Sequence, residues 1–275
     1  MGIVKKYYGI IGLCVIVLMQ LIALMKIPFA NYWITPIGWF GYIIFIDWLV
    51  YRRKRRSLMM SRRREFILTF PLSIGLWCVF ELHNLLFRNW EYILPDSLII
   101  ILIGQGLSFA TVLPAMLETY EFLESRDLFK ITVKPQLYRK GVLIGEIVFG
   151  GALIATATFA PSIYTGPLIW PGYMFVFAPL NYLVGVPAVL KEREKGDASG
   201  IVNLMAAGYI CGFVWEFLNY WAGAKWIYHM PLLEDVKIFE MPILGFLGFG
   251  PFAVALIEMY RFVAHFLKRS GKVRF

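Results

Sequence analysis

The chain has 275 residues, of which 59% are hydrophobic and 16% charged, and its formal net charge is +9. This composition excludes an ordinary soluble domain, because apolar runs of about 20 residues recur along the chain and each is long enough to cross a bilayer. The positive charge does not indicate a nucleic-acid-binding protein, since the basic residues lie between apolar runs. We therefore expect an all-α polytopic membrane protein.

The first half of the chain contains four apolar runs. We expect membrane-spanning helices over residues 7–25, 33–51, 66–87 and 97–120. A short loop between the second and third runs carries eight positive charges, which place it on the cytoplasmic side and could also bind anionic lipid head groups. These eight residues are Arg52, Arg53, Lys54, Arg55, Arg56, Arg62, Arg63 and Arg64.

The second half repeats this pattern, with spans expected over residues 141–158, 168–190, 200–222 and 242–266. Eight spans with both termini inside place the strongly basic segments on one side of the membrane. The charged segment 125–140 is then a cytoplasmic hinge between a first repeat, residues 1–124, and a second, residues 141–275. The arginine bias of the loops favours a bacterial or archaeal inner membrane.

An internal repeat relates the two halves, because four groups of residues recur in the same order at offsets of 134 to 140 residues. The matched pairs are Asp47 with Asn181, Glu81 with Glu216, Asn84 with Asn219, Trp90 with Trp226, Tyr92 with Tyr228, and Glu118 with Glu258. Each half has an even number of predicted spans, so both halves enter the membrane in the same orientation. This predicts two parallel four-helix repeats related by a pseudo-twofold axis along the membrane normal.

Each Glu-x-x-Asn pair lies in or beside an apolar run, where an ionisable residue is costly and by default indicates a functional site. Residues three apart share a helix face, so Glu81 with Asn84, and Glu216 with Asn219, could present a carboxyl and an amide to one cavity. Burial favours the protonated carboxyl, which could act as a general acid, with His83 assisting near the outer rim. The alternative is that these groups only hold helices together by hydrogen bonds.

A second polar layer is predicted nearer the cytoplasmic side. Its members are Asp47, Glu118, Asn181 and Glu258. A structural role is the stronger interpretation here, because Arg126 and Arg261 are close enough in sequence to pair with Glu118 and Glu258. Asp47 lies beside the basic loop, so we expect an interfacial salt bridge for it.

Aromatic residues are abundant enough to line a cavity as well as the membrane interfaces. The candidates for the wall of a substrate site are Trp77, Trp90, Tyr92, Trp215, Trp221, Trp226 and Tyr228. No metal site is expected, since the three His residues show no ligand spacing, and no cofactor is expected, since no nucleotide-binding motif is present.

Three classes of function remain open at this stage. The favoured one is a membrane enzyme that uses acid/base chemistry on a lipophilic substrate, such as an isoprenoid or another lipid, with aromatic faces stabilising a developing cation. The second is a proton-coupled transporter whose Glu residues carry the protons. The third is a non-catalytic membrane protein in which the polar layers serve packing or assembly.

Overall fold

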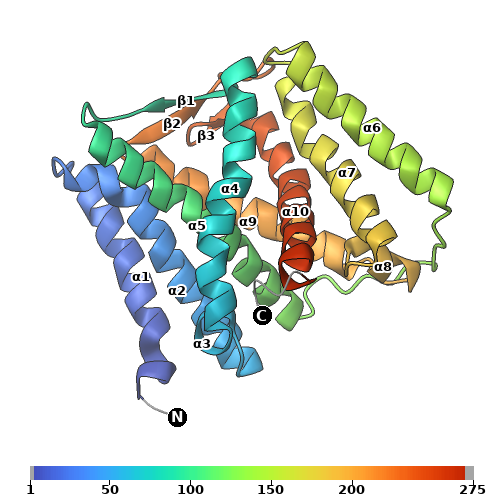
Figure 1. Ribbon diagram of the computed structural model, residues 1–275. Coiled ribbons are helices and arrows are strands. Elements are labelled where there is room, and N and C mark those ends of the chain that lie inside the picture. The colour runs from blue at the N-terminus through green and yellow to red at the C-terminus, as the bar shows by residue number, and fades with distance from the viewer. Residues whose placement is uncertain (1–2, 270–275) are drawn as a thin grey trace.

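The computed structural model describes residues 3–269 and is mainly helical (Figure 1). Among these described residues, seven helical segments are long and apolar enough to cross a membrane, so an all-α polytopic membrane fold fits the structure. These segments are Lys6–Leu24, Ala30–Lys54, Arg63–Phe87, Leu98–Ser125, Lys140–Phe159, Ser199–Tyr220 and Ile243–Leu267.

The two halves have the same order of elements. The first half consists of α1 (Ile3–Leu24), a 3-10 turn η1 (Ala30–Trp33), α2 (Ile34–Lys54), α3 (Leu58–Ser61), α4 (Arg63–Phe87), β1 (Trp90–Ile93) and α5 (Leu98–Ser125). The second half consists of α6 (Lys140–Phe159), η2 (Gly166–Leu168), α7 (Ile169–Val184), α8 (Val189–Glu194), α9 (Ser199–Tyr220), β2 (Lys225–Tyr228), β3 (Lys237–Ile238), β4 (Met241–Pro242), η3 (Ile243–Gly248) and α10 (Phe249–Arg269). The hairpin β3–β4 and η3 have no counterpart among the described residues of the first half, 3–124.

The span predicted over residues 168–190 is shorter in the structure. Helix α7 has 16 residues, so at about 1.5 Å per residue it measures roughly 24 Å, less than the ~30 Å apolar core of a bilayer. It ends at Gly185, whose φ of 81° is left-handed, and the Val186 N–H donates to the Asn181 carbonyl at 2.9 Å. This is the hydrogen bond of a glycine-based helix stop, and it lies within the apolar run that suggested a longer span.

The helices form two outer pairs around a central group (Figure 1). The pair α1–α2 flanks one side and α6–α7 the other, with α4, α5, α9 and α10 between them. Glycines allow close contact in both outer pairs, because a methyl group at Gly12 would overlap the Gly41 carbonyl, and one at Gly150 would overlap the Gly172 carbonyl. Such small residues let membrane helices approach closely.

A two-stranded antiparallel ribbon, β1–β2, joins the halves at one end of the molecule (Figure 1). Its register pairs Trp90 with Tyr228 and Tyr92 with Trp226. Since alternate residues of a strand face the same side, these four rings share one face. Trp90 and Tyr92 correspond to Trp226 and Tyr228 at the repeat offset of 136 residues, so one cross-strand pair is the repeat counterpart of the other. The ribbon therefore has the local symmetry of a twofold axis.

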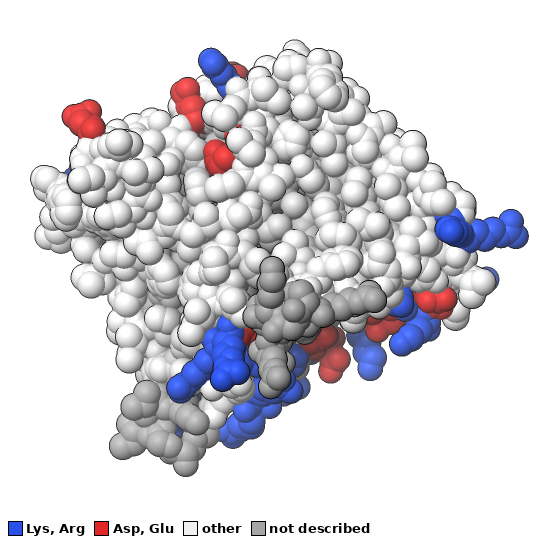
Figure 2. All heavy atoms as spheres, in the orientation of Figure 1, with Lys and Arg blue, Asp and Glu red and all other residues white. Residues whose placement is uncertain are grey.

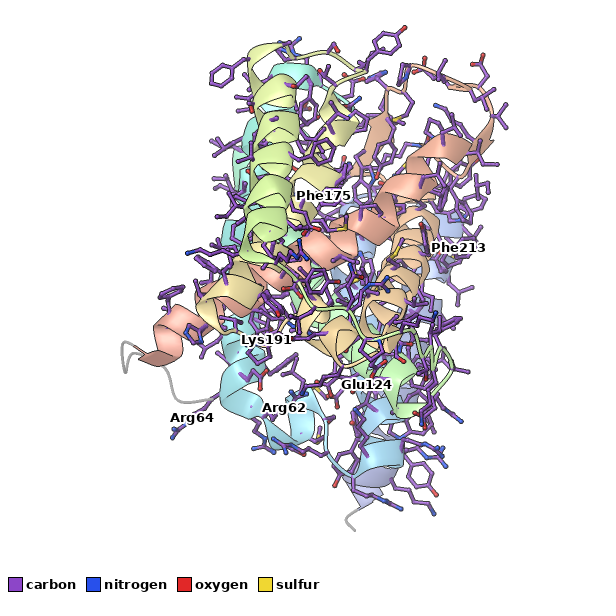
Figure 3. All side chains as sticks on the ribbon, turned by 90° about the vertical axis from the view of Figure 1, so that its right-hand side faces the viewer. Arg62, Arg64, Glu124, Phe175, Lys191 and Phe213 are labelled. Atoms are coloured by element: carbon purple, nitrogen blue, oxygen red, sulfur yellow. The ribbon has the colours of Figure 1, made fainter. Side chains whose placement is uncertain are left out.

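Basic residues gather at the end of the molecule opposite the ribbon (Figure 2). A view turned by 90° shows Arg62, Glu124 and Lys191 near that end, away from Phe175 and Phe213 (Figure 3). The loop between α2 and α4 and the segment between α5 and α6 both contribute to it. The basic segments thus share one end of the fold, as the positive-inside pattern predicts.

Candidate functional site

The two repeated Asn residues hold the ribbon in place. The Asn84 side chain donates from Nδ2 to the Trp90 carbonyl at 2.7 Å and accepts from the Trp90 N–H at 3.2 Å. Asn219 makes the same two bonds with Trp226, at 2.8 and 2.9 Å. Both amides therefore anchor strand backbone, and neither is among the residues that line the aromatic pocket described below.

The Glu81 carboxylate lies behind the first strand of the ribbon. One oxygen, Oε1, accepts hydrogen bonds from Trp77 Nε1 at 2.7 Å, Trp90 Nε1 at 3.2 Å and the Tyr92 hydroxyl at 2.5 Å. Three donors on one oxygen are a strong environment for a carboxylate inside a membrane. The side chain itself is half-buried.

The Glu216 carboxylate has a similar but sparser environment. Its Oε1 accepts from the Tyr228 hydroxyl at 2.8 Å and from Trp226 Nε1 at 3.3 Å, and Trp226 Nε1 also donates to the Tyr228 oxygen at 2.8 Å. Glu216 is completely buried, and its second oxygen, Oε2, has no hydrogen-bond partner. The second carboxylate is thus more deeply buried and less completely satisfied than the first.

Burial raises the pKa of both ribbon phenols, Tyr92 and Tyr228, well above the usual value, and the neighbouring carboxylate raises it further. The hydroxyls therefore remain protonated at neutral pH. A protonated phenol beside a carboxylate is a hydrogen-bond donor to it, as the distances require. Each strand of the ribbon consequently carries one Tyr whose hydroxyl donates to a Glu of the preceding helix.

An aromatic pocket lies beneath the ribbon and takes side chains from both halves. Six of the seven predicted wall residues line it, namely Trp77, Trp90, Tyr92, Trp215, Trp226 and Tyr228. Further rings that the sequence did not single out join them, including Trp39, Phe109, Trp170, Phe249 and Phe252. The cavity volume is about 150 Å³, the size of apolar cavities that hold a benzene-sized molecule.

Several predicted site residues lie elsewhere. Glu81 and Glu216 are not on the pocket surface but contact the Tyr and Trp side chains that form it. Trp221, also predicted for the wall, is 42% exposed, packs against Tyr220 and does not line the aromatic pocket. It is the residue that follows the last turn of α9.

His83 does not join the outer Glu residues. Its ring bonds to the Tyr173 hydroxyl at 2.9 Å and to Thr158 Oγ1 at 3.4 Å, and it stacks on Phe87. These contacts connect α4 to α6 and α7. The structure thus gives His83 a place between helices, outside the pocket lining.

In the inner layer, Asp47 and Glu118 hold the short helix α3. The completely buried Asp47 accepts from the Tyr8 hydroxyl at 2.5 Å, from Ser57 Oγ at 3.0 Å and from the Met59 N–H at 2.8 Å. Glu118 accepts from the Leu58 N–H at 3.0 Å. Asp47 is therefore a buried anchor for backbone and not the interfacial residue that its place beside the basic loop suggested.

The inner layer of the second half is built on the same plan with different partners. Glu258 accepts from the Val189 N–H at 3.3 Å, at the start of α8, and from Asn181 Nδ2 at 2.7 Å. Arg261 forms an ion pair with it at 2.7 Å, as predicted. The predicted pair of Arg126 with Glu118 is not formed, since the Arg126 guanidinium lies over the Phe122 ring at 5.4 Å.

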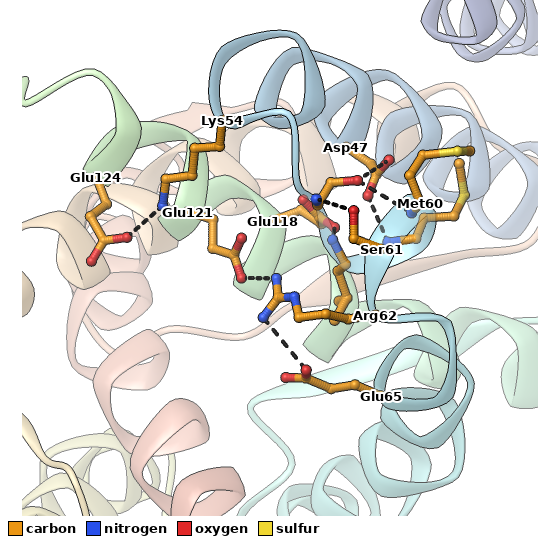
Figure 4. A network of polar contacts seen from close by, with 12 residues as sticks. Asp47, Lys54, Met60, Ser61, Arg62, Glu65, Glu118, Glu121 and Glu124 are labelled. Carbon is orange, nitrogen blue, oxygen red and sulfur yellow. Dashed lines mark hydrogen bonds and ion pairs between the residues drawn. The ribbon is translucent and has the colours of Figure 1, made fainter. Parts of the chain in front are cut away.

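Ion pairs surround a second, charged pocket at the basic end of the molecule (Figure 4). Lys54 pairs with Glu124 at 2.8 Å, and Arg62 pairs with both Glu121 and Glu65. These pairs connect the α2–α4 loop to the end of α5. Most of the cations that line this pocket are thus neutralised within the protein.

No protein-family model, curated protein or solved structure matches this chain. The chemistry of the site is therefore inferred from its own geometry.

Proposed function

We propose that the protein is a membrane-embedded enzyme that transfers protons to and from a lipophilic substrate, such as an isoprenoid or another lipid. One observation carries this proposal. Tyr92 and Tyr228 line the aromatic pocket, and each donates a hydrogen bond to a Glu that lies in a membrane helix. Acid/base groups beside an apolar pocket are what proton transfer on such a substrate requires.

The Tyr–Glu pair supplies a two-way route for a proton. When the phenol oxygen takes a proton from the substrate, the hydroxyl proton passes to the carboxylate, and the reverse movement returns it. The surrounding indole and phenyl faces favour positive charge that develops on the substrate. Glu81 and Glu216 thus act through the tyrosines, and Asn84 and Asn219 keep the strands in position.

A separation between the two pockets favours an enzyme over a transporter. Within residues 3–269, the aromatic pocket and the charged pocket share no lining residue. A buried apolar cluster that includes Leu113, Met116, Leu256 and Ile257 belongs to the central helices α5 and α10. A transported solute needs a continuous path, and these features do not provide one.

We also propose that the chain forms two parallel four-helix repeats with both termini on the cytoplasmic side of an inner membrane. The common order of elements, the glycine contacts in α1–α2 and α6–α7, and the symmetric register of the ribbon support this arrangement. Helix α7 is then the shortest of eight membrane helices. Exposed basic residues such as Arg52, which lies over the Trp48 ring at 4.8 Å, are suited to anionic head groups.

The proposed activity can be tested on purified protein in liposomes supplied with an isoprenoid lipid extract in heavy water. We expect deuterium to enter the substrate, as measured by mass spectrometry, and Tyr228→Phe to abolish the exchange. Trp221→Phe is the matched control, because Trp221 lies outside the pocket, and it should retain full exchange. Proton-coupled movement of a solute across the liposome without any exchange would instead favour the transporter.

A further inference from the structure

Three residues of the aromatic pocket carry buried polar atoms without a hydrogen-bond partner. These atoms are Thr35 Oγ1, Asn89 Oδ1 and Trp215 Nε1, in side chains that are 3%, 5% and 9% exposed. Buried polar atoms in folded proteins nearly always have a partner, so each such atom calls for an explanation, such as water or a bound ligand. A purely apolar ligand would leave all three unsatisfied.

Two of the three atoms belong to the same corner of the pocket. Thr35 precedes Trp39 by four residues on α2, so both lie on one helix face. The Trp39 ring packs edge-on against the Trp215 ring of α9, with centroids 5.8 Å apart. The unpartnered hydroxyl and the unpartnered indole N–H thus lie where α2 meets α9, and we call Thr35 with Trp215 the polar corner.

The polar corner is next to the second Tyr–Glu pair. The Trp215 ring lies 5.6 Å from the Trp226 ring. Trp226 in turn bonds through Nε1 to both Glu216 and Tyr228. The repeat-related position, formed by α4 and α7, carries no such polar atoms, because the residues that match Trp215 and Thr35 at the repeat offsets are Phe80 and Ile169. The unsatisfied donors therefore accompany one Tyr–Glu pair only.

The chemistry of the corner identifies the ligand group that fits it. An indole N–H can only donate, and a Thr hydroxyl can donate while it accepts elsewhere, so both are satisfied by one oxygen with two lone pairs. The rest of the pocket is aromatic and suits an apolar skeleton. We infer that the substrate is an apolar molecule with a carbonyl oxygen, such as an isoprenoid ketone, whose carbonyl end Trp215 and Thr35 hold beside Tyr228 and Glu216.

This assignment rests on the proposed function and makes its chemistry more specific. A carbonyl acidifies the neighbouring C–H bond. Tyr228 takes that proton while its own passes to Glu216, and the electron pair of the broken C–H bond moves to the carbonyl oxygen as an enolate. The donors of the polar corner stabilise that oxygen. Return of a proton to another carbon completes an isomerisation, so no oxidant or reductant is consumed.

Binding can be measured without turnover, using the isoprenoid ketone geranylacetone and the isoprenoid hydrocarbon farnesene with the full chain in nanodiscs. Calorimetry should show that the wild type prefers the ketone. Trp215→Phe retains a ring but removes the N–H, so it should raise the Kd for the ketone about 10-fold and leave the hydrocarbon unchanged. Thr35→Val, which has nearly the same shape, should act in the same direction.

The matched control is Trp170→Phe, since Trp170 lines the same pocket outside the polar corner. It should change the binding of both probes alike. Equal affinity of the wild type for ketone and hydrocarbon, or an equal loss for both in Trp215→Phe and Thr35→Val, would overturn the inference. Selective ketone binding without deuterium exchange would support the carbonyl site and overturn the proposed enzymatic activity. Deuterium exchange into a hydrocarbon would support the enzymatic activity and overturn the carbonyl site.

Discussion

The two Glu-x-x-Asn segments differ in their surroundings although they are matched in sequence. Glu81 is half-buried and has three donors on one oxygen, whereas Glu216 is fully buried with two donors and one oxygen without a partner. One turn before each Glu stands Trp77 in the first half and Gly212 in the second. Trp77 supplies the third donor, while Phe249 occupies the space next to Gly212.

From this contrast we propose that the first copy of the repeat is mainly structural and that the second takes part in the proposed chemistry. The partly exposed Glu81 carboxylate has three hydrogen-bond donors on one oxygen. The completely buried Glu216 carboxylate has a second oxygen, Oε2, without a hydrogen-bond partner. Both copies of the repeat thus hold the ribbon through an Asn side chain, Asn84 or Asn219. The residues one turn before each Glu, Trp77 and Gly212, make the two Glu sites different.

The largest expected effect is on activity. Glu216→Gln should lower the rate of deuterium exchange about 10²- to 10⁴-fold, because the amide cannot accept the proton from Tyr228. Glu81→Gln should lower it by less than about 10-fold if the first pair is structural. Rates are compared by mass spectrometry under identical conditions. An equal loss of exchange rate in Glu216→Gln and Glu81→Gln would contradict the proposal that the two Glu sites have different roles.

The inner layers provide a second contrast, through Arg261 and Arg126. Arg261→Gln should lower the free energy of unfolding by roughly 3 kcal/mol, since it removes the charged partner of the fully buried Glu258. Arg126→Gln should cost less than about 0.5 kcal/mol, because Arg126 only stacks on Phe122. Thermal unfolding in detergent measures the stability of both variants. A large loss of stability in Arg126→Gln would show that Arg126 pairs with Glu118, as their proximity in the sequence suggested.

The ribbon anchors should be nearly equivalent in the two halves, which tests the shared part of the repeat. Asn84→Ala and Asn219→Ala each leave a strand N–H and carbonyl without their side-chain partner, so each should cost about 2 kcal/mol of stability. The loss should be the larger for Asn219, which is completely buried. A loss confined to one variant, measured as Tm in detergent, would show that the ribbon is anchored by one half alone.

The smallest effect concerns the starts of the helices that carry the two Glu residues. Hydrogen bonds from Ser199 hold the pKa of Asp197 below its usual value at the start of α9, whereas α4 starts beside the ion pair of Arg62 with Glu65. A lowered pKa in the folded state stabilises the protein above the unfolded pKa, and this contribution is lost as the pH falls through the folded value. On acidification, the Tm of Asp197→Asn should therefore fall by about 1–2 °C less than the Tm of the wild type. An unchanged profile would contradict this.

The composition and order of the chain predicted much of the fold but less of the site. Helix α4 and helix α9 follow from apolar runs. The repeat singled out the Trp and Tyr pair after each Glu, but the sequence did not predict that these segments form strands. The pocket rings Trp39 and Trp170 gave no signal, because aromatic residues are common throughout the chain. The sequence predicted Trp221 and not Trp39 for the pocket wall, because composition cannot distinguish a ring that faces lipid from one that faces a pocket.

The sequence by itself determined the membrane class, the basic end and the repeated residues, because hydropathy, charge and offset are read along the chain. Only the tertiary structure decided that Asn84 and Asn219 bind strand backbone, that each Glu lies behind a Tyr, and that Trp215 Nε1 has no partner. Hydrogen bonds of this kind depend on which residues of different elements meet in space. The length of α7 depended on a local signal at Gly185, because a left-handed glycine ends a helix within an apolar run.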